Sequence, residues 1–166
     1  MPEELDVRWR RARDWLETVR HAAARIEPLI REIAAMQEAY DSMLPWATTG
    51  RGSGGKGTHS DPTAAQAMAR SESYDVLIAD KRAKLDALYD IVGDCGRVLM
   101  RLGDALGDEC SLALELYYVD VAYTWSDVAD EMGVTRRQLS RIRDKSYEWI
   151  EENCDAHLRG TRKVLV

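Results

Sequence analysis

The sequence predicts an all-α protein: a long antiparallel helical hairpin with coiled-coil character, followed by a C-terminal helix-turn-helix domain. Two long stretches carry apolar side chains every three or four positions, which is the period of an amphipathic helix. Two helix-start signals then follow each other closely near the C-terminus, with a glycine between them. We therefore expect a hairpin over residues 1–106, a helix-turn-helix over 107–155 and a tail over 156–166.

The first long helix is expected from Leu5 to Leu44. Pro28 interrupts this stretch, but the apolar pattern keeps its phase across the proline, which favours one kinked helix over two helices broken near Glu27. A narrow apolar stripe on so long a helix needs a partner to cover it. The stripe consists of Leu5, Trp9, Ala12, Leu16, Val19, Ala23, Ile26, Ile30, Ile33, Met36, Tyr40 and Leu44.

Residues 45–61 are rich in glycine and are expected to form a flexible loop. Gly50, Gly55 and Lys56 nearly match a phosphate-binding P-loop, but Gly57 stands where that motif needs serine or threonine. The motif also needs a preceding strand and an immediately following helix, and the flanking sequence predicts neither. A basic linker that touches DNA through Arg51 and Lys56 is the simpler interpretation.

The second long helix is expected to begin at Asp61 and Pro62, because aspartate caps a helix and proline fits its first turn. Its apolar pattern weakens around Gly93 and Gly96 but continues beyond them. Two long helices joined by a loop fold back most simply as an antiparallel hairpin, although the stripes also suit pairing between two chains in a homodimer. The second stripe consists of Ala64, Met68, Tyr74, Leu77, Ile78, Leu85, Leu88, Val92, Cys95, Leu99, Leu102 and Leu106.

Two consecutive capped helices are the most informative feature of the chain. Thr124 with Asp127, and Thr135 with Gln138, each have the spacing of a capping box, in which side chain and backbone satisfy each other at a helix start. Between them, Gly133 suits the left-handed conformation that ends a helix tightly. The positions expected to form one buried face are Val128, Met132, Val134, Leu139, Ile142 and Ser146.

Segments on both sides of this pair complete the expected domain. A helix over residues 109–119 is predicted to pack across the pair as its support, after a boundary marked by Gly103 and Gly107. Trp149 and Ile150 are expected to close the small core. Residues 156–166 are expected to be a disordered tail, with a phosphate-contacting arm of Arg159, Arg162 and Lys163 as the alternative.

The second helix of the pair is strongly basic. From Arg136 to Lys145 there are five cations and one anion, a local charge of +4 in a chain whose total is −6. Such a helix can dock in the major groove of double-stranded DNA, where arginine pairs with guanine and nearby cations hold phosphates. The alternative is a helical hairpin whose basic face is only solvated. The outward positions are Arg136, Arg137, Ser140, Arg141 and Asp144, with Arg143 and Lys145 on the flanks.

The net charge, the cysteines and the histidines argue against several classes of protein. A net charge of −6 argues against a protein that coats nucleic acid or an anionic membrane over its whole surface. Cys95, Cys110 and Cys154 show no paired spacing, so we expect no disulfide framework, and a cytoplasmic location. Neither a metal or cofactor site nor a membrane segment is expected. His21 and His59 lack a partner nucleophile or carboxylate in the pattern, so we expect no catalytic residues and no enzyme activity.

The C-terminal part resembles region 4 of bacterial sigma factors, the module that reads the −35 promoter element. The resemblance rests on Leu116-Tyr117-Tyr118, on Trp125-Ser126-Asp127-Val128-Ala129, on Met132-Gly133-Val134 and on the arginine-rich helix after Thr135. It does not extend to the N-terminal half, which has no counterpart of the DNA-melting region 2. An acidic chain with a helical N-terminal half and this C-terminus is similar to phage late-gene transcriptional regulators of the ArpU and RinA type.

The resemblance implies sequence-specific binding of double-stranded DNA in transcription control, contact with RNA polymerase, and a location in the bacterial host cell. It implies that Trp125 and its turn position the first helix of the pair against the DNA backbone. The residues expected to face bases or phosphates are Thr135, Arg136, Arg137, Ser140, Arg141 and Asp144, with Lys145 beside them.

Two other functions fit the same sequence. A DNA-packaging protein similar to a terminase small subunit joins a helix-turn-helix to helices that assemble into a ring. A helical scaffold would instead bind proteins through the hairpin and would have no affinity for DNA at physiological salt.

Overall fold

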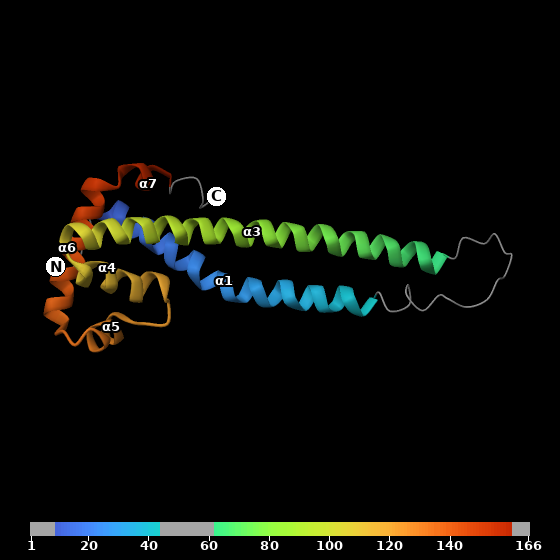
Figure 1. The fold of residues 1–166 in the computed structure, drawn as a ribbon, viewed down its shortest axis with the longest axis horizontal. Coiled ribbons are helices and arrows are strands. Elements are labelled where there is room, and N and C mark those ends of the chain that lie inside the picture. The colour runs from blue at the N-terminus through green and yellow to red at the C-terminus, as the bar shows by residue number, and fades with distance from the viewer. Residues whose placement is uncertain (1–8, 44–61, 161–166) are drawn as a thin grey trace. The chain divides into compact units, whose positions relative to one another are not determined.

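The computed structural model describes residues 9–43 and 62–160, and every regular element within them is helical (Figure 1). The expected all-α fold is therefore confirmed. The glycine-rich segment 45–61, Leu5, Leu44, and Arg162 and Lys163 of the tail lie outside the described residues, as do the side chains of residues 62–68. In chain order the elements are α1 (Arg10–Met43), α3 (Pro62–Leu106), α4 (Asp108–Leu114), the π-helix η2 (Glu115–Val119), α5 (Trp125–Glu131), α6 (Arg136–Asn153) and α7 (Asp155–Gly160).

The helix α1 continues through Pro28 without a break, so the alternative of two helices separated near Glu27 is wrong. The predicted apolar stripe matches the buried positions at the start of the helix. Further along, the buried positions are displaced from the predicted ones by one residue. Leu29 is 7% exposed, whereas Ile30, which was expected to be buried, is 36% exposed. The buried positions include Trp15, Ala22 and Leu29, which are seven residues apart. An apolar spacing of three or four residues does not distinguish this set of positions from the set displaced by one residue.

The helix α3 runs from Pro62 to Leu106, as expected from the capping signal at Asp61 and Pro62. It continues through Gly93 and Gly96 without interruption. Among the expected stripe positions, Leu77 is exposed whereas Ile78 beside it is buried. The sequence predicts both residues in the stripe, but they lie about 100° apart around the helix, and in the second compact unit only Ile78 is covered.

The chain divides into two compact units, and the division does not follow the boundary expected near residue 106. The first compact unit comprises residues up to Arg25 together with those from Leu88 onward, and the second comprises Ile26–Ala87. The ends of both long helices share one hydrophobic core with the C-terminal helices. Its buried members are Ala12, Trp15, Leu16, Val19, Cys95, Val98, Leu99, Leu102, Cys110, Leu114, Tyr118, Tyr147, Ile150, Cys154 and Leu158.

The second compact unit is an antiparallel pair formed by the adjoining parts of α1 and α3. Lys81 Nζ lies 2.5 Å from Glu32 Oε2, and the Tyr40 hydroxyl donates to Asp75 Oδ2 at 3.4 Å. Residues later in α1 thus meet residues earlier in α3, as an antiparallel arrangement requires. The expected helical hairpin is present in this unit.

In the first compact unit, the predicted support helix is present. Its first part is an α-helix and its second part is a π-helix. Gly107, with φ +106°, separates α3 from α4, and α4 passes directly into the π-helix η2. A π-helix is wider than an α-helix and is found mostly as a single turn inserted in a helical segment. Leu116 and Tyr118 of η2 are buried, so this turn carries two core side chains.

The expected disordered tail is wrong for residues 156–160, which belong to α7. Cys154 and Leu158 are buried in the shared core, and this burial holds the short helix in place. Arg11 of α1 binds Glu151 at 2.6 Å and Asp155 at 2.9 Å, which ties the start of α1 to the end of α6 and the start of α7. None of the helices in the described ranges has both the length and the apolar composition needed to cross a membrane.

Candidate nucleic-acid interface

Both predicted capping boxes are present, one at the start of α5 and one at the start of α6. The Thr124 hydroxyl accepts from the Asp127 N–H at 3.3 Å, and Asp127 Oδ2 accepts from the Thr124 N–H at 2.8 Å. Thr135 and Gln138 make the same reciprocal pair at 3.2 and 2.9 Å. Gly133 adopts φ +65° in the turn between the helices, as predicted. The direction of α6 is therefore set at its first residue.

A hydrophobic cluster beneath α5 and α6 fixes which face of α6 is turned to solvent. Val128, Ala129 and Leu139 are buried together with Ala113 and Leu116 of the supporting segment. The expected face also includes Met132, Val134 and Ile142, which are half-buried, and Ser146, which is fully buried and donates to the Ile142 carbonyl oxygen at 2.8 Å.

The solvent-facing side of α6 holds most of the candidate DNA-binding residues. Arg136, Arg137, Arg141 and Lys145 are all exposed, and Ser140 between them is half-buried. Arg137, Arg141 and Lys145 recur every four residues, so they follow one side of the helix. The Arg136 guanidinium also donates to Ser126 Oγ of α5 at 3.0 Å, which links the two helix starts. The Thr135 hydroxyl is engaged in its capping box.

Arg143 differs from its basic neighbours because its side chain turns back toward the core. Its guanidinium carbon lies 5.4 Å from the Trp125 ring centroid and 6.0 Å from that of Tyr147. One guanidinium nitrogen is 3.5 Å from Asp144, another of the candidate residues. Within residues 136–145, four of the five cations are thus exposed, and Arg143 acts in packing.

Trp125, which was expected to help α5 meet a DNA backbone, is packed within the protein. Its ring stacks on Tyr117 of η2, with centroids 3.9 Å apart and an interplanar angle of 11°. The Arg20 guanidinium carbon lies 4.0 Å from the Tyr117 ring centroid, and that of Arg143 lies over the Trp125 ring. Each of the two stacked rings therefore contacts one cation. The expected role of the Trp125 turn on DNA stays a prediction.

Arg20 also binds the segment between η2 and α5, a contact that the sequence does not predict. Its guanidinium donates to the carbonyl oxygens of Tyr117, of Val121 at 3.3 Å and of Tyr123 at 3.5 Å. Val121 adopts φ +59°, a conformation that a β-branched residue rarely occupies. In the sequence, Arg20 is one arginine among many on a long helix, so no local signal separates it from the others.

Cys95, Cys110 and Cys154 are buried free thiols, and burial raises the pKa of Cys95 to about 12. Among the described residues, no group of three His, Cys, Asp or Glu side chains is placed to hold a metal ion. The geometry of α6 instead suits docking onto a polyanion.

Comparisons of the chain with protein-family models, with curated proteins and with solved structures found no match. What this surface binds must therefore be inferred from its charges and its geometry.

Proposed function

We propose that the protein binds double-stranded DNA sequence-specifically through the N-terminal half of α6 and acts in the control of transcription in the bacterial cytoplasm. The observation that carries the proposal is the exposed row of Arg137, Arg141 and Lys145, beside Arg136, on a helix whose opposite face is buried. An α-helix with its side chains is about as wide as the major groove of B-DNA. Arginine at such positions can pair with O6 and N7 of guanine.

Rigid presentation supports specific binding over loose electrostatic attraction. The capping box at Thr135, the Arg136–Ser126 hydrogen bond and the cluster around Leu139 hold the start of α6 from three sides. Base readout needs side chains on a fixed frame, because a bidentate contact is lost with small displacements. The overall charge of −6 repels DNA elsewhere, so docking is expected to concentrate on α6.

Two further parts of the proposal concern the partners of the protein. Contact with RNA polymerase is supported by the resemblance to sigma region 4. Pairing of two chains through the long helices is supported by apolar side chains exposed on them, including Ile30, Val76 and Leu77. Mass in solution separates this proposal from the packaging alternative, since a regulator is expected as a monomer or dimer and a packaging protein as a larger ring.

The test begins with selection of bound sequences from a random pool of DNA duplexes, followed by mobility shifts on the selected site. Arg137→Ala and Arg141→Ala are each expected to reduce discrimination between selected and random DNA by about 1–3 kcal/mol. Arg31→Ala, which removes an exposed arginine of the second compact unit, is the matched control and should leave binding unchanged.

Salt dependence provides an independent measure. If three or four of the exposed α6 cations neutralise phosphates, log affinity should fall with log salt with a slope of about −3 to −4. Equal binding by the wild type, Arg137→Ala and Arg141→Ala would remove the basis for assigning DNA binding to α6.

A further inference from the structure

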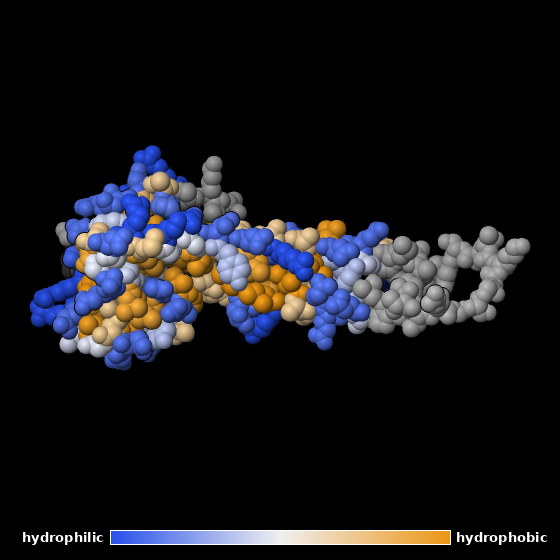
Figure 2. All heavy atoms as spheres, in the orientation of Figure 1, coloured by the Kyte–Doolittle hydropathy of each residue, from blue (hydrophilic) through white to orange (hydrophobic). Residues whose placement is uncertain are grey.

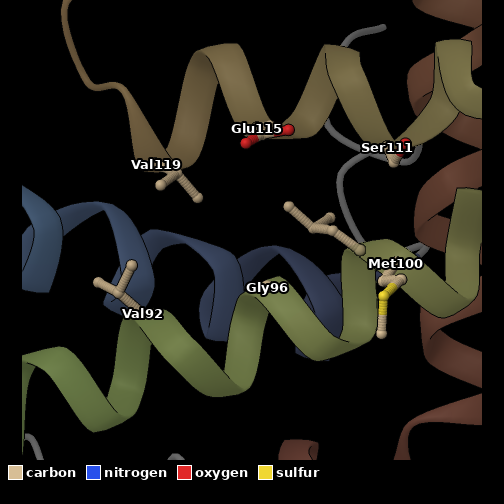
Figure 3. Close-up of a pocket in the computed structure, with 7 residues that line it drawn as sticks. Val92, Gly96, Met100, Ser111, Glu115 and Val119 are labelled. Atoms are coloured by element: carbon tan, nitrogen blue, oxygen red, sulfur yellow. The ribbon is translucent and has the colours of Figure 1, made fainter.

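A groove on the first compact unit has no residue of α6 in its lining and takes no part in the proposed DNA binding. It encloses about 270 Å³ between α3 and the α4–η2 segment. The α3 wall is formed by Val92, Gly96, Leu99 and Met100. Ser111, Glu115 and Val119 form the opposite wall, and Figure 3 shows Val92 and Val119 pointing toward each other across the space.

The two walls approach closely at one end and separate toward the other. A Cβ placed on Gly103 would lie 3.0 Å from Ser111 Oγ, so the two walls are in close contact at this glycine. A Cβ placed on Gly96 would meet no atom within 4 Å. The groove is therefore open above Gly96, where the absence of a side chain leaves room for another chain to come close to the α3 backbone.

Apolar side chains surround the opening instead of being buried. Met100 is 66% exposed, Tyr89 on the preceding turns of α3 is 49% exposed, and Leu112 beside Ser111 is 43% exposed. Figure 2 shows hydrophobic residues at the surface where α3 and α4 run next to each other. A flexible methionine at the edge of an apolar groove is typical of surfaces that bind helices.

One wall of the groove is acidic. The α4–η2 segment, residues 108–119, contains three Asp or Glu residues and no Lys, Arg or His, whereas the α3 wall carries Arg97, which is paired with Asp94, and Arg101, which lies over the Trp149 ring. Glu115 is exposed and lines the groove itself, while Asp108 and Glu109 lie on the same segment. An occupant would therefore meet an apolar floor and an acidic edge, and a partner with cations beside its apolar side chains is favoured over a neutral or acidic one.

We propose that this groove binds a basic amphipathic helix of another protein. A helix fits because the groove already lies between two helical walls, and a third helix can pack along both with its apolar ridge over Gly96. Leucine-like side chains of the partner fill the space between Val92 and Val119. A lysine or arginine one turn away pairs with Glu115. The surface is separate from α6, so it serves a partner that does not compete with DNA.

The probe is a synthetic amphipathic helix with leucine at positions i, i+3, i+4 and i+7 and lysine elsewhere, titrated against the full chain by fluorescence anisotropy. A second peptide keeps the leucines and replaces every lysine with glutamate. The lysine peptide is expected to bind, and to shift the signal of the Met100 methyl group in NMR spectra of ¹³C-methyl-methionine protein. The glutamate peptide is expected to bind at least about tenfold more weakly.

Two pairs of variants locate the binding. Gly96→Trp places an indole at the open groove, on a position where a Cβ meets no atom within 4 Å, and should weaken binding of the lysine peptide by at least about tenfold. Ala105→Trp is its control, because this exposed residue lies about two and a half turns further along α3, on the opposite side of the helix. Glu115→Gln should weaken binding several-fold, whereas Glu152→Gln, an exposed residue of α6 outside the lining, should not.

The proposal is overturned if Gly96→Trp binds the lysine peptide as well as the wild type does, or if both tryptophan variants weaken it equally. Equal affinity for the lysine and glutamate peptides would overturn the assigned charge of the partner. Each variant is first shown to melt like the wild type. DNA mobility shifts of Gly96→Trp should match the wild type, so failure here is distinguishable from failure of the α6 proposal.

Discussion

The guanidinium of Arg20 lies 4.0 Å from the centre of the Tyr117 ring and also donates a hydrogen bond to the carbonyl oxygen of the same residue. One side chain of α1 thus holds both the ring that supports Trp125 and the backbone that leads from η2 to α5. Because Val121 in that backbone has φ +59°, the segment depends on contacts from outside itself. The orientation of α5 and α6 is therefore linked to α1.

Replacing Arg20 with methionine is expected to lower the free energy of unfolding by about 2–3 kcal/mol. Methionine keeps an apolar stem of similar length but leaves carbonyl oxygens of a half-buried segment without their donor, and it removes the cation from the Tyr117 ring. Urea unfolding followed by tryptophan fluorescence measures the change.

Arg25→Met is the matched control for that substitution, because Arg25 is an exposed arginine further along the same helix. Its free energy of unfolding should stay within about 0.5 kcal/mol of the wild type. If Arg20→Met were no more destabilising than Arg25→Met, the link between α1 and the η2–α5 segment would not contribute to stability.

Local signals explain which parts of the fold were predictable. The capping boxes at Thr124 and Thr135 and the positive φ of Gly133 depend on residues within three or four positions, so they are visible in the sequence. The helix periods are likewise local. The choice between Ile30 and Leu29 is not, because it depends on which side of α1 its partner covers.

Contacts between distant segments explain what was missed. Arg20 acts on residues about a hundred positions later, and α7 is held by Leu158 entering a core that begins at Ala12. The same core joins the ends of the long helices to the C-terminal helices, so no composition change marks the division between the units. Arg143 belongs to the basic run by sequence and to the aromatic stack by structure.

Arg141 and Arg143 are expected to respond oppositely to alanine substitution. Arg141→Ala should lower DNA discrimination and leave stability within about 0.5 kcal/mol, since its side chain is exposed. Arg143→Ala should instead lower stability by about 1–3 kcal/mol through lost packing against Trp125 and Tyr147. Thermal melts and mobility shifts on the same preparations measure both effects.

Arg143→Met distinguishes packing from charge at that position. The Nε–H of Arg143 is buried and meets no acceptor among the described residues, so methionine removes an unsatisfied donor and keeps most of the packing. It should recover most of the stability lost in Arg143→Ala. A loss of DNA affinity in Arg143→Met as large as in Arg141→Ala would show that Arg143 belongs to the DNA-binding surface.

The buried hydroxyls of Tyr118 and Tyr147 are 2.6 Å apart and form one hydrogen bond inside the shared core. Burial raises the pKa of both residues, that of Tyr147 to about 12, so both are neutral at physiological pH. Tyr118→Phe or Tyr147→Phe alone leaves one hydroxyl without its partner and should cost about 1–3 kcal/mol. The double variant should cost clearly less than the sum, because it leaves no orphaned hydroxyl. Simple additivity in urea unfolding would mean that the two hydroxyls are not energetically coupled.

The two capping boxes predict different responses to acid. Hydrogen bonds from the Thr124 hydroxyl and backbone N–H hold the pKa of Asp127 below its ordinary value, whereas the equivalent box at Thr135 uses the uncharged amide of Gln138. A carboxyl whose pKa is lowered by folding stabilises the native state fully above its unfolded pKa of about 4, and this stability is lost as the pH falls through the lower folded pKa.

Asp127→Asn should therefore reduce the drop in melting temperature between pH 7 and pH 3. Gln138→Glu should increase it, because it adds a second box of the same kind. An unchanged pH dependence in both variants would show that the charge of the capping carboxylate does not stabilise α5.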